Sequence, residues 1–250
     1  LTGYYPGIKL IVSGKSPQSN GVVGSAVSSE VAVELKAAGY DGIVIRNASK
    51  DPVYLYVDDE RVELRDASKL WGKSGIETLK MLREDLKVDY DLEGAKPWPP
   101  ALYIGPAGEN LVRTAPVNSK WTHGAGYGGY GAVMGSKKLK AIVVRGRGPL
   151  PDVANREEFI KLRSQVIETI LSRAYHFRYW GTPSEYYWAG SRKSSEPIRN
   201  WQEEWHDKKE FSHHELETRV WVRRYWSDWG CALSCMKVSL VNLNGKYYLT

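Results

Sequence analysis

Residues 124–145 read GAGYGGYGAVMGSKKLKAIVVR, a glycine-rich stretch that leads into a predicted strand, Ala141–Arg145. Glycine lets the backbone approach a ligand closely and turn its N–H groups inward, so the loop at 124–135 is predicted to bind an anion. Three lysines follow and could add positive charge: Lys137, Lys138 and Lys140. The spacing matches neither a Walker A loop nor a dinucleotide-binding fingerprint. A flexible surface loop, or tight backbone packing without a ligand, is the alternative.

The composition indicates a folded protein with an anionic ligand or an acidic partner. Of the 250 residues, 42% are hydrophobic, which is enough to bury a sizeable core, and the net charge is +6. Basic residues are spread along the chain and mixed with acidic ones, as in Lys208-Lys209-Glu210, and no arginine-rich run occurs. Nucleic acid is therefore not expected as a partner. Two cysteines, no secretory signal and only short apolar runs predict a soluble, cytoplasmic protein that does not enter a membrane.

The first part of the chain is rich in predicted strands. Periodicity and turn residues favour strands at Ile8–Ser13, Asp41–Arg46, Ala101–Ile104 and near Leu111–Ala115, with a hairpin over Pro52–Arg65. Helices are predicted after Ser29, to Ala38, and after Ser74, to Leu86, the second with Ile76, Leu79, Met81 and Leu82 on its inner side. Residues 14–25 are expected to form a loop, and Gly105–Gly108 a tight turn.

A domain boundary is predicted near Gly146–Pro151, which contains two glycines and two prolines. Residues 1–148 would form the first domain, and residues 149–250 would begin a mainly helical one, with helices at Arg156–Ser172 and His214–Trp221. The fold class is therefore α+β. Because the chain starts at Leu1 without a methionine and stops just after the apparent strand Lys246–Leu249, we expect it to be a fragment.

The second candidate site is the sequence DWGCALSC, residues 228–235. Two cysteines four residues apart, Cys231 and Cys235, would be neighbours on a helix and could share a metal, with Asp228 as a third ligand through oxygen. Iron–sulfur clusters generally need four ligands. Core thiols or an unrelated pair of cysteines are equally compatible with the spacing.

Several segments together resemble the tungsten-containing aldehyde:ferredoxin oxidoreductase family. The most specific are IGPAGENLVR at Ile104–Arg113 and GAVMGSKKLKAIVVRG at Gly131–Gly146. Further similar segments are AGYDGIVI at Ala38–Ile45, KDPVYLYVDD at Lys50–Asp59, RDASKLWGK at Arg65–Lys73, GTPS at Gly181–Ser184 and PIRNW at Pro197–Trp201. The resemblance extends over essentially the whole chain.

The resemblance implies a first domain built of two sheets that binds a bis-pterin cofactor of tungsten or molybdenum. Magnesium would bridge the two pterin phosphates, and a 4Fe–4S cluster would pass electrons to ferredoxin. The implied reaction is the oxidation of a small aldehyde to a carboxylic acid. The resemblance is also compatible with a homo-oligomer. Alternatives are a related reductase of a carbonyl or aromatic thioester, and a paralogue without catalysis that binds or transfers electrons.

The resemblance also assigns residues. The backbone carbonyls of Ala26 and Gly124 would bind magnesium. The other cofactor-binding residues would be Lys9, Ser28, His123, Ala125, Gly126 and Tyr127. Because His123 and Tyr127 stand where the family usually has arginines, permanent positive charge is missing there. A protonated His123 could still donate a hydrogen bond, and Lys137 or Lys138 could compensate.

The cluster ligands implied by the family are Asp228, Cys231 and Cys235. Most members have a cysteine at the first of these positions, whereas formaldehyde-type members have an aspartate, as here. The catalytic acid or base and the fourth cluster ligand are expected beyond Thr250, so no catalytic residue is assigned.

Overall fold

In the computed structural model, the chain divides into two units, Leu1–Asp152 and Val153–Thr250. The structure describes residues 8–86, 98–120, 123–181, 202, 221–228 and 230–249. The division falls just after the predicted boundary at residue 148. Of the helices in the described part of the chain, none combines the length and the apolar character that crossing a membrane would require.

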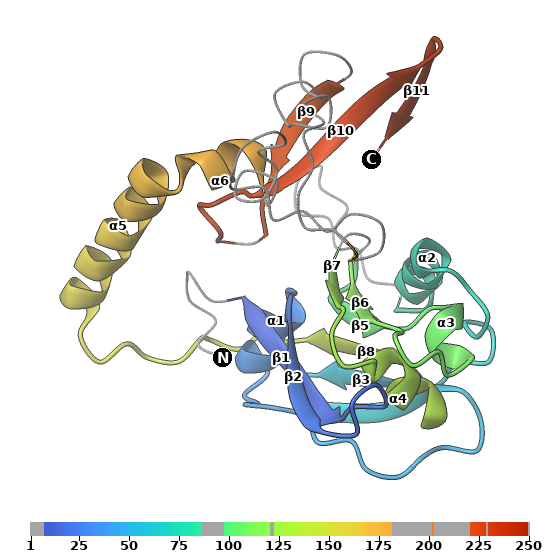
Figure 1. The fold of residues 1–250 in the computed structure, drawn as a ribbon. Helices are drawn as coiled ribbons and strands as arrows, with labels where there is room; N and C mark the ends of the chain where they lie inside the picture. Colours follow the sequence, from blue (N-terminus) through green and yellow to red (C-terminus); the bar gives the residue numbers. More distant parts are fainter. Residues whose placement is uncertain are drawn as a thin grey trace. The chain divides into compact units, whose positions relative to one another are not determined.

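The first unit is built on a six-stranded sheet (Figure 1). Its strands are β3 (Val53–Asp58), β4 (Arg61–Asp66), β5 (Ala101–Tyr103), β6 (Val117–Ser119), β7 (His123–Ala125) and β8 (Leu139–Arg145). Their order is β4-β3-β8-β5-β6-β7, and only the β3–β8 pair is parallel. The short strand β7 therefore lies at one edge of the sheet. The predicted hairpin over residues 52–65 is confirmed as β3 and β4.

A separate two-stranded hairpin precedes this sheet. It pairs β1 (Lys9–Lys15) with β2 (Val22–Ser28), so the predicted first strand is confirmed. The prediction of a loop throughout residues 14–25 was wrong at both ends, because β1 continues to Lys15 and β2 begins at Val22. The small residues of VVGSAVS conceal a strand whose core-facing members are Val23, Ser25 and Val27.

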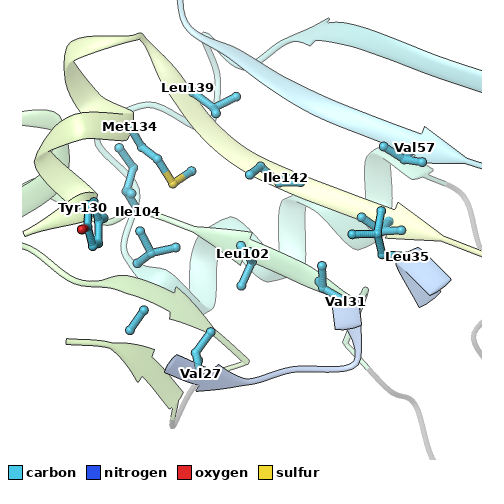
Figure 2. Packing of buried hydrophobic residues seen from close by; sticks show 13 residues of the cluster. Val27, Val31, Leu35, Val57, Leu102, Ile104, Tyr130, Met134, Leu139 and Ile142 are labelled. Atoms are coloured by element: carbon cyan, nitrogen blue, oxygen red, sulfur yellow. The ribbon is translucent and has the colours of Figure 1, made fainter. Parts of the chain in front are cut away.

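The two faces of the six-stranded sheet carry two apolar cores. One core is covered by the hairpin and by the helices α1 (Val31–Ala37) and α4 (Tyr130–Ser136), and Figure 2 shows Val31, Leu35, Tyr130 and Met134 packed over it. The other core is covered by α2 (Gly75–Leu86), which buries Leu79 and Leu82. Each core removes apolar side chains from water, and this burial stabilises the folded state by about 25 cal/mol per Å² of buried apolar surface.

Some predicted elements differ in the structure. Asp41–Arg46 forms no strand, and the side chain of Val44 is 82% exposed, because this segment pairs with no neighbouring strand among the described residues. No strand occurs at residues 111–115, since the next strand is β6. The turn at Gly105 leads into a short helix, α3 (Pro106–Glu109). In α2, Ile76 is exposed and Thr78 is buried in its place.

The second unit contains helices followed by strands. Helix α5 (Arg156–Arg173) confirms the predicted helix, and its N-cap Asn155 accepts a hydrogen bond from the Glu158 N–H. Helix α6 (Tyr175–Trp180) follows. The strands β9 (Trp221–Trp226), β10 (Met236–Leu243) and β11 (Lys246–Leu249) form an antiparallel sheet. The predicted strand Lys246–Leu249 is confirmed as β11, whereas β9 and β10 were not predicted. The predicted helix at 214–221 falls mostly outside the described residues.

Candidate functional site

The hairpin brings several predicted cofactor-binding residues to one place. Lys9 on β1 lies directly opposite Ser28 on β2, and Ala26 lies two residues from Ser28 along the same strand. Strand β2 packs against β7, which carries His123, Gly124 and Ala125. The two strands belong to different sheets, so their facing edges are not joined in a strand ladder. Residues separated by about a hundred positions in the sequence therefore share one edge of the first unit.

The glycines of the loop fall into two groups, which we call the packed half (residues 128–135) and the open half (residues 124–127). In the packed half, a methyl group at Gly129 would lie 1.9 Å from the Arg113 carbonyl oxygen, and one at Gly135 would lie 1.9 Å from the Gly108 carbonyl oxygen. A methyl group at Gly131 would lie 2.4 Å from the Pro116 carbonyl oxygen. These glycines are required for backbone packing, which the sequence had offered as an alternative to ligand binding.

The open half has space around it. A methyl group at Gly126 would meet no protein atom within 4 Å, and one at Gly124 would come no closer than 3.4 Å to another atom. Both glycines are exposed, and so is the side chain of Tyr127, at 64%. Ala125, between the glycines, is buried in the core. This half is therefore anchored in the core by Ala125, while Gly124 and Gly126 on either side of it are exposed.

Two N–H groups in the loop are bound by the N-terminal hairpin region. The Tyr127 N–H donates to Ser25 Oγ at 3.0 Å, and the Gly128 N–H donates to Gln18 Oε1 at 2.9 Å. The Tyr130 hydroxyl donates to the carbonyl oxygens of Gly14, at 2.9 Å, and Val23. These contacts fix the loop in place. The N–H groups of Tyr127 and Gly128 are therefore already bonded and are not available to bind an anion. Sequence reasoning missed Ser25 and Gln18, since no local pattern marks partners more than a hundred residues away.

The three lysines after the loop are all bound within the protein. Lys140 is fully buried and pairs with Glu109 at 2.5 Å, and burial lowers the pKa of Lys140. Its Nζ also donates to the Lys73 carbonyl at 3.1 Å, while Glu109 accepts the Gly72 N–H at 2.7 Å. Lys137 Nζ donates to the Asn47 carbonyl at 2.8 Å.

Lys138 lies 5.0 Å from the centre of the Trp71 ring, in a cation–π contact. The family-like segments at residues 65–73, 104–113 and 131–146 thus bind one another through their charged side chains. They build the scaffold beneath the loop. The expectation that Lys137 or Lys138 compensates for the absent arginines is not supported by these contacts.

The open half fits the phosphate end of a pterin cofactor. Strand β7 is at the edge of its sheet, and an edge strand leaves backbone carbonyl groups available. Magnesium prefers oxygen ligands, which the carbonyls of Ala26 and Gly124 would provide. At Gly126 no protein atom lies within 4 Å of the Cβ position, so a ligand could approach the backbone there. The donor chemistry and the space are both present at this edge.

The cysteine motif lies on a turn of the second unit, before β10. The Cys231 N–H donates to the Asp228 carbonyl at 3.0 Å, and Arg178 of α6 donates to the Ala232 carbonyl at 2.5 Å. The expectation that Cys231 and Cys235 are neighbours on a helix was therefore wrong. Within the described residues, no three His, Cys, Asp or Glu side chains are gathered to hold a metal. These three donors do not form a closed cluster site by themselves.

Comparison with known proteins places the chain in a family. Residues 1–146 match the N-terminal domain of aldehyde ferredoxin oxidoreductase. The chain is 51% identical over 243 residues to the "Aliphatic sulfonate oxidoreductase, WOR-like subunit" of Pyrococcus furiosus, a match that covers 96% of this chain and 39% of that protein. It is 43% identical over 164 residues to the "Tungsten-containing aldehyde ferredoxin oxidoreductase" of Pyrococcus horikoshii, covering 66% of this chain and 26% of that protein.

The solved structure titled "Active site complex BamBC of Benzoyl Coenzyme A reductase in complex with 1,5 Dienoyl-CoA" has a similar fold. Its TM-score is 0.72 with 32% sequence identity, over 100% of this chain and 38% of that chain. The chain thus spans less than two fifths of the length of these relatives. The domain match covers more than half of the chain, and the relative from Pyrococcus horikoshii is named as a tungsten-containing oxidoreductase. The chain belongs to the aldehyde ferredoxin oxidoreductase family.

Proposed function

We propose that this chain forms the tungsten-pterin-binding part of an enzyme that oxidises an aldehyde to a carboxylic acid. Membership of a tungsten oxidoreductase family supports this proposal. The structural observation that carries it is the convergence of β2 and the edge strand β7 beside the open glycines Gly124 and Gly126. When bound, the tungsten centre would supply the two-electron oxidation chemistry, and molybdenum in the same pterin would supply the same type of chemistry.

The residues of this chain would bind and orient the cofactor. The carbonyl groups of Ala26 and Gly124 would hold magnesium, which in turn binds phosphate oxygens. Lys9, an exposed residue of β1 opposite Ser28, would bind a phosphate oxygen. Ala125 to Tyr127 would lie along the pterin.

Electron transfer is a second part of the proposal. Asp228, Cys231 and Cys235 would supply three ligands of a 4Fe–4S cluster, and ferredoxin would be the electron acceptor. The support is the chemistry of two thiols and a carboxylate within eight residues. We expect Asp228→Cys to keep the cluster and to shift its midpoint potential, because a thiolate replaces an oxygen ligand at one iron. An unchanged potential in a redox titration would exclude Asp228 as a ligand.

Metal and pterin analysis of the full-length protein tests the main proposal. We expect tungsten or molybdenum, two pterins and magnesium in each chain, together with aldehyde-dependent reduction of a viologen dye. A protein that contains iron without tungsten, molybdenum or pterin would instead be a binding or electron-transfer paralogue. A protein that contains none of these groups would contradict the family-based function altogether.

A second candidate substrate is an aliphatic sulfonate. The observation that favours it is the 51% identity over nearly the whole chain with a relative named for that activity, whereas the aldehyde-type relative from Pyrococcus horikoshii matches over 66% of the chain. A carbonyl or aromatic thioester reductase is a further alternative, favoured by the similar benzoyl-coenzyme A reductase structure. Steady-state assays of one holoenzyme preparation with an aldehyde, an aliphatic sulfonate and an aromatic thioester distinguish the three, since the highest kcat/KM identifies the substrate class.

A further inference from the structure

Asn118 lies beside the open half of the loop, although no sequence pattern marks it. In the β6–β7 pair, Asn118 is directly opposite Gly124, and in the β5–β6 pair it is directly opposite Tyr103. Residues directly opposite each other in an antiparallel sheet project to the same face. Because Gly124 has no side chain, the Asn118 side chain borders an empty position at the edge of the sheet.

The Asn118 side chain is partly exposed and lies next to the open position at Gly124. Its Oδ1 lies 3.4 Å from the point that a Cβ of Gly124 would occupy. The side chain makes no hydrogen bond to the part of the chain that the structure describes. Since the carboxamide is partly exposed and already has no partner within the described residues, it can bind a ligand without breaking a hydrogen bond of the protein. A ligand seated on Gly124 would provide the partner.

The charges around the loop indicate what kind of ligand group Asn118 would meet. Lys137, Lys138 and Lys140 are bound to other parts of the scaffold, as described above. An anionic group at Gly124 therefore depends on other hydrogen-bond donors. The carboxamide has two N–H donors on Nδ2, and a half-turn of the group exchanges Oδ1 with Nδ2.

We propose that Asn118 Nδ2 donates a hydrogen bond to a phosphate oxygen of the cofactor held at Gly124. This inference rests on the proposed function and names one more binding residue for the same site. A neutral amide would thus supply part of the hydrogen bonding that a lysine or arginine would otherwise give. Asn118 would hold the cofactor without contributing to the stability of the cofactor-free fold.

The test compares Asn118→Leu and Asn118→Asp with the wild-type full-length holoenzyme. The measurements are tungsten and pterin per chain and the rate at which pterin is released on heating, followed by the fluorescence of the oxidised pterin. A hydrogen bond to a charged group contributes roughly 1.5–3 kcal/mol, so Asn118→Leu should release pterin about ten times faster or more. Asn118→Asp should release it faster still, because a carboxylate repels phosphate.

Two controls separate this role from a structural one. Asn110→Leu removes an exposed carboxamide that already donates to the Pro106 carbonyl at 2.9 Å, and it should leave pterin release unchanged. The melting temperature of the cofactor-free protein should be the same for Asn118→Leu and the wild type. Pterin retention equal to that of the wild type, in either Asn118 variant, would overturn the inference. If the wild type itself carried no tungsten, molybdenum or pterin, the proposed function would fail instead.

Discussion

In the packed half of the loop, a methyl group at Gly129 or Gly135 would lie 1.9 Å from a carbonyl oxygen of another segment, whereas at Gly126, in the open half, it would meet nothing within 4 Å. Glycine thus serves two purposes within twelve residues. In residues 128–135 it lets backbone segments pack closely, and in residues 124–127 it leaves room for a ligand. The difference shows that a glycine-rich composition does not by itself indicate how much of a loop binds a ligand.

The largest effect is expected from the buried ion pair beneath the packed half. Lys140→Met leaves the Glu109 carboxylate buried without its cation, which should lower the free energy of unfolding by about 3–5 kcal/mol. Urea unfolding of the cofactor-free protein measures this change. The double variant Lys140→Met with Glu109→Leu should recover part of the loss. If Lys140→Met left stability unchanged and lowered only cofactor content, Lys140 would belong to the ligand site.

Within the packed half, Gly129→Ala should be the most disruptive single methyl addition. The new Cβ would clash with the Arg113 carbonyl oxygen, and Gly129 also has a φ of +70°, which disfavours any other residue. Overpacking of this kind costs about 1–3 kcal/mol, and the backbone strain adds to it. The melting temperature of the cofactor-free protein should fall. A melting temperature equal to that of the wild type would contradict the assignment of this half to packing.

In the open half, Gly126→Ala should change the stability of the cofactor-free protein by less than about 0.5 kcal/mol, because the methyl group meets no atom. The holoenzyme should contain less pterin and less tungsten, since the methyl group would occupy space proposed for the cofactor. Metal analysis and pterin fluorescence measure both. The comparison between the halves would be refuted by a large loss of stability with normal cofactor content.

The smallest effect is expected at Glu34, which holds the end of β8 against α1. Its carboxylate accepts the Gly146 N–H at 2.7 Å, and desolvation raises the pKa of Glu34 above its usual 4.5. A raised carboxyl pKa stabilises the fold at low pH, and this contribution is lost as the pH rises above 4.5 towards the folded-state pKa. Glu34→Gln keeps an acceptor and removes the titration. Its melting temperature relative to the wild type should therefore be higher at pH 7 than at pH 4.

The sequence predicted elements well where the signal was local. The hairpin over residues 52–65 and the helix from Arg156 follow from alternation and from the cap residue Asn155, which act within a few positions. The strand β2 was missed because VVGSAVS is small and polar, and it forms a strand only through pairing with β1. A strand was expected at Asp41–Arg46 for its apolar residues, yet a strand forms only where a neighbouring strand supplies the hydrogen bonds, which the local sequence does not reveal.

For the site, the sequence by itself determined the family, the position of the glycine-rich loop and the residue types that would bind phosphate, because these depend on residue identity and order. Only the tertiary structure decided which glycines pack and which stay open, since that depends on which atoms another segment brings close to the position that a Cβ would occupy. It also decided that Lys137, Lys138 and Lys140 bind the scaffold and that Asn118 adjoins Gly124. Such contacts join residues far apart in the chain, and they form only when the whole sheet is assembled.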